Sequence, residues 1–486
     1  MPIIIPANSA ASGGYEVDNS LRFNTASSDY LTKTYSTTAT SKKILTVSAW
    51  VKRSTLGAVN EVFSASRASD GFQTDMIRFG ASDQLEFFSF PSTGGTTSVK
   101  TTRVFRDTSA WYNIVVQVNT TDNTAADRVR MYVNGVRETS FATGSYPAQN
   151  SDLQPIGIAS GTVHSVGAVG TSSYFGGYLA EVVYADGQAL DATSFGEFDE
   201  DSGIWKPIDV SGLTFGNNGF YQQYLQSGTG TNDSGMGADT SGNDNHYAVN
   251  NLTAIDQSTD TCTNNFATMN PLDNYWQGSA FSEGSLTVTT TNASQSYNTS
   301  SIMVSSGKWY VECKPVSGGS EPEIGIFSKL TGANAGNNSQ LSYNANGYAY
   351  RASDPGSVWY NGSAVSTSFS QYANGDIVGI ALDLDNNKLY FSKNGTFGNS
   401  GNPTSGATGT GAISIVAPAS TTLGAYGFAA NENFNDQNKV FSWNFGSPPY
   451  AISSGNTDGN DHGNFEYAVP SGYLALCTKN LSEVDS

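Results

Sequence analysis

Apolar and polar residues alternate with a period of two through most of the chain. In residues 111–118 (WYNIVVQV), the side chains of Tyr112, Ile114, Val116 and Val118 fall on one face. The same alternation recurs at 44–51, 84–90, 308–313, 323–327, 376–383, 388–392 and 440–445. This pattern predicts many short β-strands, each with a buried face.

A two-residue turn joins two of the predicted strands. Residues 128–133 (RVRMYV) and 136–141 (VRETSF) flank Asn134 and Gly135. Asn-Gly favours a tight hairpin because both turn positions need a positive φ, which these residue types adopt at low cost. We expect an antiparallel hairpin whose turn consists of these two residues.

Helical periodicity is almost absent from the sequence. The best helix candidate begins at Asp191, a suitable N-cap, and covers Ala192 to Phe198. Strands dominate, and turn formers separate them at short intervals. The pattern therefore predicts an all-β protein with two β-sandwich (jelly-roll) domains in tandem.

Changes in composition along the chain predict its domain boundaries. Residues 227–245 consist almost entirely of turn formers, which is typical of a long irregular linker. We expect an extended N-terminal arm at 1–14, a first sandwich at 15–225, a linker at 226–280, a second sandwich at 281–450 and a C-terminal tail at 451–486.

The charge balance narrows the possible partners. Of the 486 residues only 13% are charged, and the formal net charge is −19. Such a surface repels phosphate backbones, so we expect no nucleic-acid partner. No apolar run approaches the roughly 20 residues of a membrane-spanning helix, and the N-terminal residues do not read as a secretory signal. We therefore expect no membrane partner either.

The cysteines point to no cofactor. Cys262, Cys313 and Cys477 lie far apart and form no CxxC pair, which argues against a zinc site. The odd number argues against a disulfide framework. Reduced thiols fit a protein that is made and folded in a cytoplasm. No cofactor is expected, and Ca²⁺ is the one candidate ion.

The first predicted sandwich resembles a concanavalin-like laminin-G domain. The residues that carry the resemblance follow the family's order, at 21–23 (LRF), 30–31 (YL), 45–51 (LTVSAWV), 111–115 (WYNIV), 131–135 (MYVNG) and 175–184 (FGGYLAEVVY). The resemblance implies a lectin-like jelly roll for residues 15–205.

The second predicted sandwich resembles a SPRY domain. Its marks are the motifs at 307–312 (GKWYVE), 324–326 (IGI), 375–383 (GDIVGIALD) and 389–395 (LYFSKNG). The resemblance implies a recognition module, because the loops at one end of a SPRY sandwich form its binding surface.

The segments that join these domains resemble the connectors of a group of bacteriophage structural proteins that couple the same two domains. They include 186–191 (DGQALD), 203–207 (GIWKP), 239–243 (DTSGN) and 470–481 (PSGYLALCTKNL). The resemblance covers nearly the whole chain after residue 14. It implies a virion protein, placed on the virion surface and made in the host cytoplasm.

Concanavalin-like folds also include glycosidases, which need two carboxyl groups flanking the sugar bond. The nearest match is the run 197–201 (EFDED), in which Glu197, Asp199 and Asp201 would share one face of a strand. The run follows the short helix candidate and precedes a turn at Ser202 and Gly203. We interpret it as a solvated acidic turn, so no catalytic residue is predicted.

An oxygen-rich loop at 239–244 is the candidate metal site. Asp239, Asn243 and Asp244 offer carboxylate and amide oxygens, which are the ligands that Ca²⁺ prefers. A cluster of Asx turns without an ion accounts for the same residues. The run 383–387 (DLDNN) also begins like a calcium loop, but Lys388 stands where such a loop needs glycine, so we expect a hairpin turn there.

Five aromatic residues gather between residues 343 and 362. Tyr343 precedes the four residues Tyr348, Tyr350, Trp359 and Tyr360, which we assign to a ligand-binding surface. The alternating strands already supply a core, and aromatic residues beyond what a core holds tend to be exposed at contact sites. The alternative is that these residues belong to strands and pack inside.

These inferences predict a non-enzymatic bacteriophage virion protein. We expect a fibre or adhesin that recognises a glycan or protein on the host-cell surface. It would contact other virion proteins and form a homo-oligomer, namely a trimer, because weak single sites gain from multivalency. The alternatives are a capsid- or tail-decoration protein that docks onto neighbouring virion proteins, and a polysaccharide depolymerase.

Overall fold

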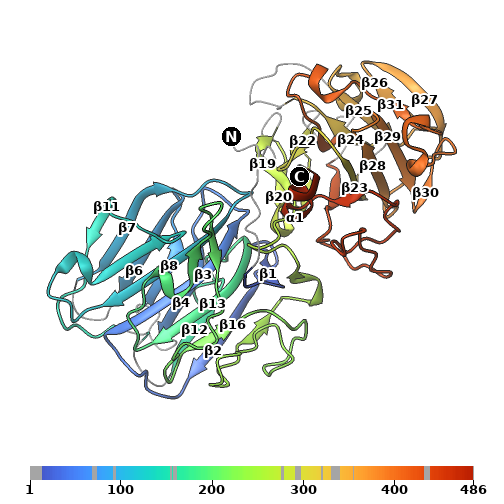
Figure 1. Cartoon of the computed structure of the whole chain (residues 1–486). Helices are drawn as coiled ribbons and strands as arrows, with labels where there is room; N and C mark the ends of the chain where they lie inside the picture. The colour runs from blue at the N-terminus through green and yellow to red at the C-terminus, as the bar shows by residue number, and fades with distance from the viewer. Residues whose placement is uncertain are drawn as a thin grey trace. The chain divides into compact units, whose positions relative to one another are not determined.

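The computed structural model describes residues 14–67, 74–90, 95–153, 156, 161–274, 278–290, 297–318, 321–329, 340–353, 355–431 and 438–484. It divides into two compact units, with the boundary between Asn264 and Asn265. Each unit is a β-sandwich, coloured blue to yellow-green and yellow to red in Figure 1. The all-β fold class is confirmed. The predicted arm at 1–14 lies outside the described residues except for Gly14.

The first sandwich consists of two antiparallel sheets. One has the strand order β10 (Val136–Arg137), β9 (Val129–Val133), β8 (Trp111–Asn119), β3 (Ile44–Arg53), β13 (Gly177–Asp186), β1 (Ser20–Phe23) and β18 (Gln257–Ser258), with β16 (Phe220–Gln222) also paired to β13. The other has the order β11 (Phe141–Ser145), β7 (Thr97–Val104), β6 (Gln84–Phe90), β5 (Thr74–Phe79), β4 (Asn60–Arg67), β12 (Thr162–Val166), β2 (Tyr30–Tyr35) and β17 (Ala248–Asn250).

The alternation of apolar residues places the first core as predicted. Tyr112, Ile114, Val116 and Val118 of β8 all pack into it. The hairpin between β9 and β10 is also confirmed, since Val133 pairs with Val136 and both turn residues have positive φ, 46° at Asn134 and 78° at Gly135. A short β14 (Gly196–Phe198) and β15 (Trp205–Pro207) form a separate two-stranded sheet.

The second sandwich has the same layered design. One sheet has the order β19 (Met269–Asn274), β22 (Tyr297–Ser300), β32 (Gly427–Asn431), β24 (Glu323–Phe327), β25 (Gly347–Arg351), β26 (Gly356–Tyr360) and β27 (Ser363–Phe369). The other has the order β20 (Ala280–Ser282), β21 (Thr287–Thr289), β33 (Val440–Asn444), β23 (Lys308–Ser317), β28 (Val378–Asp383), β29 (Lys388–Lys393) and β30 (Thr396–Phe397); β31 (Ile413–Ser414) pairs with β29 and β34 (Leu474–Ala475) with β23.

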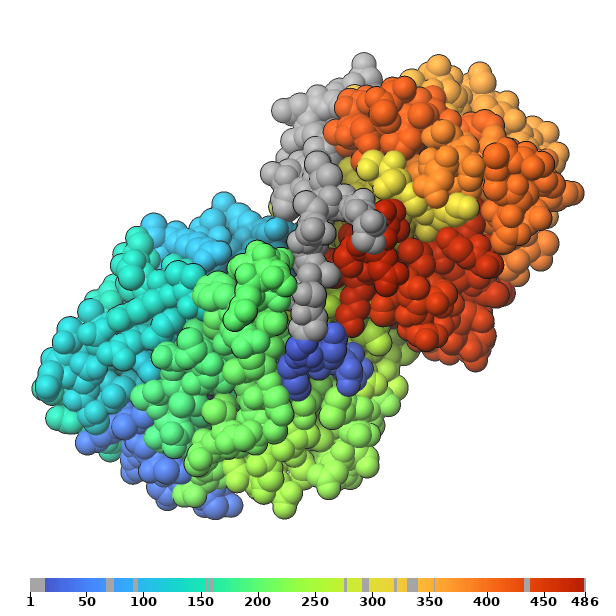
Figure 2. Space-filling view, in the orientation of Figure 1, coloured from blue at the N-terminus to red at the C-terminus, as the bar shows by residue number. Residues whose placement is uncertain are grey.

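The predicted linker at 226–280 is wrong. Residues up to 264 belong to the first sandwich, where Met236 and Tyr247 are fully buried and β17 pairs with β2. Figure 2 shows the yellow-green atoms of this stretch continuous with the surface of their unit. The turn-forming residues of this stretch belong to the packed unit, because their side chains form hydrogen bonds with the backbone of neighbouring loops. Their composition indicates turns and does not indicate exposure.

The predicted C-terminal tail at 451–486 is also part of a packed unit. Strand β34 pairs in parallel with β23, and the helix α1 (Thr478–Val484) follows it. The side chains of Leu476, Cys477 and Leu481 are buried in the second sandwich. The apolar stretch near the end of the tail therefore completes the core. The glycine-rich residues before it make this packing hard to predict from the sequence.

The helix candidate at Asp191 is shorter than predicted. The Asp191 carboxylate caps it by accepting the Thr193 N–H at 3.0 Å, as expected of an N-cap. The turn is a 3₁₀ helix over Ala192–Ser194, and β14 begins at Gly196. The chain re-enters a strand there because Gly196 packs against Trp205, which leaves no room for a side chain.

Charged side chains are buried where the first and last segments of the first sandwich meet. The Lys52 ammonium lies 2.6 Å from the Asp260 carboxylate, and each side chain is about 1% exposed. The Trp111 indole N–H donates to the other Asp260 oxygen at 3.1 Å. Breaking a buried pair of this kind is strongly destabilising, so it ties β3 to the segment after β18.

Among the described residues, no helix is long and apolar enough to cross a membrane. Cys262, Cys313 and Cys477, all of which the structure describes, form no disulfide.

Candidate functional site

The predicted aromatic surface divides between the core and the exterior of the second sandwich. Tyr348 and Tyr350 point inward from β25 and are 3% and 1% exposed, so their predicted exposure is wrong. Tyr360 stacks on Tyr348 with ring centroids 4.3 Å apart and packs against the same core. The turn formers Gly356 and Gly362 lie at strand boundaries, so alternation continues through β25 and β26 and carries every second residue inside.

Trp359 lies on the other face of this sheet, where its ring meets that of Tyr343. The Trp359 and Tyr343 rings stack with centroids 6.0 Å apart, and Tyr343 is 51% exposed. The Arg351 guanidinium lies 4.5 Å from the centroid of Trp359 and 5.7 Å from that of Tyr343. We call Tyr343, Arg351 and Trp359 the aromatic platform. Flat, partly exposed rings of this kind stack on sugar rings or on apolar groups of a protein.

A buried carboxylate holds the platform in place. Glu323 of β24 is fully buried and accepts from Arg351 Nε and Nη2 at 3.1 and 2.8 Å. It also accepts the Ser342 N–H at 3.1 Å and the Asn431 amide at 3.0 Å. Glu323 thus fixes both the guanidinium plane and the turn that carries Tyr343. The sequence analysis did not identify Glu323. The one feature that could have indicated it is the presence of an acidic residue in an otherwise apolar strand, 323–327.

Tyr350 also lines a pocket of about 500 Å³ in the second sandwich. Its hydroxyl donates to the Ser370 carbonyl at the inner wall. The remaining lining residues come from β27, β29, β30 and the loops beside them and are mostly polar, namely Ser368, Ser370, Lys393, Asn394, Thr396, Phe397, Gly398 and Asn399. Tyr350 is thus a wall residue of this pocket as well as a core residue.

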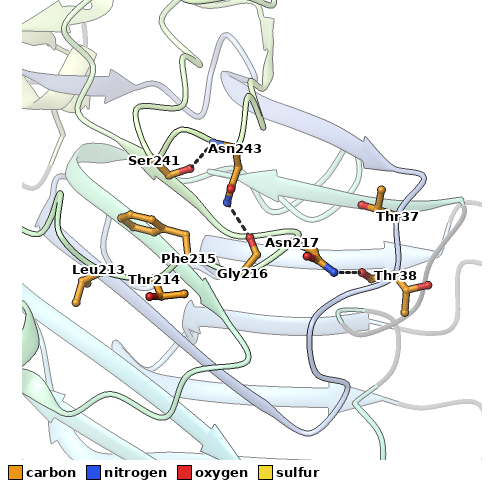
Figure 3. Close-up of a pocket in the computed structure, with 9 residues that line it drawn as sticks. All are labelled: Thr37, Thr38, Leu213, Thr214, Phe215, Gly216, Asn217, Ser241 and Asn243. Carbon is orange, nitrogen blue, oxygen red and sulfur yellow. Dashed lines mark hydrogen bonds between the residues drawn. The ribbon is translucent and has the colours of Figure 1, made fainter.

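A larger pocket, of about 860 Å³, lies at one end of the first sandwich. Figure 3 shows Leu213, Thr214 and Phe215 on one side of it and Thr37 and Thr38 on the other. Gly216, Asn217, Ser241 and Asn243 complete the lining. The lining carries no charged side chain. Its hydroxyl and amide groups are suited to hydrogen bonding with a neutral polar ligand.

Two buried carboxylates shape the loops around this pocket. Asp186, at the end of β13, accepts the backbone N–H groups of Thr40 and Asn218 at 2.6 and 3.0 Å. Asp239 accepts the N–H groups of Tyr221 and Asn245 at 2.9 and 2.8 Å. Each carboxylate links segments far apart in sequence, so the pocket has a preformed wall.

The structure does not bring the predicted calcium ligands together. Both Asp239 oxygens accept N–H groups, and Ser241 adds a further N–H and its hydroxyl at 2.9 Å each. Asn243 turns its amide nitrogen toward the carbonyls of Gly216 and Gly219, at 2.7 and 3.1 Å. Asp244 is exposed, and its carboxylate lies 3.8 Å from His246 Nε2. The Asx-turn interpretation describes these residues.

Asp244 instead forms a group with Asp233 and His246. The His246 Nδ1 accepts the Asp239 N–H at 3.0 Å, so Nε2 carries the proton of the neutral ring. Nε2 lies 3.2 Å from Asp233 Oδ1, where it donates. A metal ligand needs the lone pair of that nitrogen, so the geometry is that of a hydrogen-bonded turn.

The acidic run at 197–201 begins in β14 and continues into a turn after Phe198. Asp199 accepts the N–H and hydroxyl of Ser202 at 2.9 and 2.8 Å, and Lys206 lies 3.2 Å from its second oxygen. The Ser202 hydrogen bonds and Lys206 lower the pKa of Asp199 to about 2. Glu197 pairs with the same lysine at 3.5 Å. A general acid for glycoside cleavage needs a raised pKa, and Asp199 has the opposite.

We therefore expect no hydrolysis of glycans. Incubation with β-glucans and bacterial polysaccharides should release no reducing ends above the level of a heat-denatured control. The wild-type chain and Glu197→Gln should behave alike, because Glu197 is an exposed residue of β14 that pairs with Lys206 of β15. Release that disappears in Glu197→Gln would contradict this expectation.

A buried glutamate with two tyrosine partners also escaped the sequence analysis. Glu181 sits at a β-bulge in β13 with φ of 49°, unusual for a residue other than glycine. The hydroxyls of Tyr221 and Tyr15 donate to its Oε2, the latter at 3.2 Å. Burial raises the pKa of Glu181 to about 7. The bulge keeps this conformation because the side chain is tied from two other segments.

The fold and these surfaces define a two-sandwich β-protein of a binding type. Residues 24–193 match the family Laminin_G_3, described as the Concanavalin A-like lectin/glucanases superfamily. This match confirms the concanavalin-like part of the predicted resemblance, and such a lectin-like fold indicates a binding function. A comparison with curated proteins finds no significant match.

Solved structures similar to this chain include the following three. The SPRY domain of human HERC1 is 14% identical, with a TM-score of 0.29, and the match covers 36% of this chain and 96% of that one. A SAP-like pentraxin from Limulus polyphemus is 16% identical, with a TM-score of 0.27 and coverage of 36% and 78%. A putative carbohydrate binding protein from Bacteroides ovatus is 14% identical, with a TM-score of 0.29 and coverage of 45% and 55%.

Proposed function

We propose that this chain is a non-catalytic recognition protein of a bacteriophage virion, a fibre or adhesin that binds a glycan or protein on the host-cell surface. The observation that carries the proposal is the aromatic platform. Its two rings are held parallel and partly exposed, and Glu323 fixes the arginine beside them. A preorganised aromatic surface loses little entropy on binding, so it can supply most of the affinity.

The charge of the chain supports this mode of recognition. With a net charge of −19, the protein gains no general attraction to an anionic cell surface. The Arg351 guanidinium is engaged by Glu323 and by the two rings, so the platform offers stacking contacts and no free positive charge. Neutral sugar rings or apolar protein groups fit it best. We propose a trimer on the virion surface, which would combine several weak contacts through multivalency.

Removing one ring of the platform should abolish most binding. We expect Trp359→Ala to weaken binding to host cells or glycans about thirtyfold, which corresponds to about 2 kcal/mol for a central aromatic anchor. Tyr343→Ala should act in the same direction, because it removes the ring stacked on Trp359. Affinities are measured on bacterial cells and on arrays of bacterial-surface glycans.

The matched control for these variants is Val316→Ala, which trims a 45% exposed apolar residue of β23. It should bind like the wild type. Circular dichroism verifies that each variant is folded. Wild-type binding in folded Trp359→Ala and Tyr343→Ala would place the recognition surface elsewhere. Absence of any cell or glycan binding by the wild type would favour a decoration role instead.

A further inference from the structure

Four polar side chains lie buried together inside the first sandwich. They are Tyr35 at the end of β2, His164 of β12, Tyr184 of β13 and Tyr247 just before β17, and none is more than 2% exposed. The Tyr35 and His164 rings lie 4.5 Å apart, and His164 and Tyr184 lie 5.8 Å apart. Among the residues that the structure describes, the three tyrosine hydroxyls and His164 Nδ1 have no hydrogen-bond partner.

The walls around this group are apolar. Phe63 lies 5.6 Å from both His164 and Tyr184, and Phe220 lies 4.8 Å from Tyr247, measured between ring centroids. The Tyr35 and Tyr247 hydroxyls lie close to each other without the geometry of a direct hydrogen bond. The phenyl walls offer them no acceptor. Buried polar atoms in proteins are almost always paired, because an unpaired one has lost its hydration without compensation.

We propose that the first sandwich encloses an internal hydration site, in which ordered water bridges Tyr35, His164, Tyr184 and Tyr247. Water fits the chemistry of the site, since it both donates and accepts and typically makes two to four hydrogen bonds to buried polar groups. The hydroxyls can donate or accept, and the imidazole nitrogen accepts in one tautomer. All four groups are neutral, so the site has no need of an ion.

The charge state of His164 agrees with this assignment. Burial lowers the pKa of His164 to about 3, so the ring stays neutral at physiological pH. An anion would face no positive charge from these four groups, and an apolar molecule would leave all four polar atoms unpaired. One water molecule bonded to both Tyr35 and Tyr247 would give each hydroxyl a hydrogen-bond partner.

Two of the four residues are close in sequence to the lining of the pocket in Figure 3. Tyr35 precedes the lining residues Thr37 and Thr38, and Tyr247 follows Ser241 and Asn243 in the same manner. The segments that leave these two tyrosines therefore form two walls of the pocket. The hydration site would fix where those walls begin, and thereby the shape of the pocket.

The sign of a stability change tests the proposal. Tyr184→Phe and Tyr247→Phe each remove one hydroxyl and keep the ring. If water bridges these groups, each variant loses a hydrogen bond, and its unfolding equilibrium constant should rise about fivefold. If the hydroxyls are unpaired, their removal relieves a penalty and the first sandwich becomes more stable. Urea titration of the full chain, followed by hydrogen exchange of peptides from β12 and β13, reports on this unit alone.

Tyr224→Phe is the matched control, because the Tyr224 hydroxyl is buried and bonds directly to Gln222 at 3.3 Å. It sets the scale for the loss of one protein–protein hydrogen bond. A high-resolution crystal structure should show water within about 2.7–3.0 Å of at least two of the four polar atoms. Unchanged or increased stability in both test variants overturns the proposal, and so does a crystal structure without solvent at the site.

Discussion

Glu323→Gln should destabilise the second sandwich by about 3–5 kcal/mol and remove most binding at the aromatic platform. The carboxylate is the main partner of Arg351, whose side chain is only 9% exposed. Without that charge, the buried guanidinium keeps only the partly exposed Glu321 carboxylate, 3.9 Å away, as a counter-ion. The glutamine amide would also direct N–H groups at Arg351 or at the Ser342 N–H, where the carboxylate accepts. The turn that carries Tyr343 then loses its anchor.

Glu321→Gln is the matched control. Glu321 lies two residues earlier, its side chain is 30% exposed, and its carboxylate is 3.9 Å from Arg351. Exposed pairs of this kind contribute about 0–1 kcal/mol, so the control should unfold close to the wild type. Urea unfolding gives the free energies, and the glycan and cell assays give the affinities. Equal effects of the two substitutions would show that Glu323 has no special role.

The second large effect concerns pH and Glu181. The pKa of this carboxyl is raised from about 4.5 in the unfolded chain to about 7 in the folded one, chiefly by burial. Its stabilising contribution is therefore complete below the unfolded pKa and is lost as pH rises through the folded value. We expect the first sandwich to lose about 2–3 kcal/mol from this group between pH 4.5 and 8.

The comparison that isolates Glu181 is with Glu181→Gln, which keeps the shape and cannot ionise. The variant should match the wild type near pH 5 and become more stable than it above pH 7. Burial also raises the pKa values of Glu61 and Asp75, to about 8 and 7. The test therefore compares the free energies of unfolding of the wild type and Glu181→Gln at each pH, because Glu61 and Asp75 contribute equally to both. Glu197→Gln, at an exposed position, should follow the wild type at every pH. A gap between wild type and Glu181→Gln that does not change with pH would contradict the prediction.

The strand pattern could be predicted because burial alternates with the backbone. The alternating runs at 308–313, 323–327 and 440–445 each place one face in the second core, with Trp309, Val311, Ile324, Ile326, Phe441 and Trp443. The Asn134-Gly135 hairpin is equally local, since its turn depends only on two residues. What failed was the step from turn-rich composition to exposure. Asp239 and Asn245 are turn formers by type, yet both are buried, because distant backbone groups satisfy them.

The platform could be predicted only in part. Trp359 lies on the exposed face, and Tyr348 and Tyr350 lie on the opposite face of the same sheet. Local sequence gives the alternation but not which face meets the core. The contact between Glu323 and Arg351 joins two strands through residues 28 positions apart, so no local pattern marks it. The same holds for Glu181, whose partner Tyr15 is 166 residues away.

The pairing of β1 with β18 sets how the first sandwich responds to tension. Ser20 pairs with Ser258, and the backbone of Val17 is hydrogen-bonded to the Thr263 hydroxyl, so the chain enters and leaves this unit at neighbouring points. A force that pulls the two ends apart peels these antiparallel segments one hydrogen bond at a time and does not shear them together. The buried Lys52–Asp260 pair lies directly in the path of that peeling. The mechanical strength of the unit therefore depends on a single ion pair more than on the size of its two sheets.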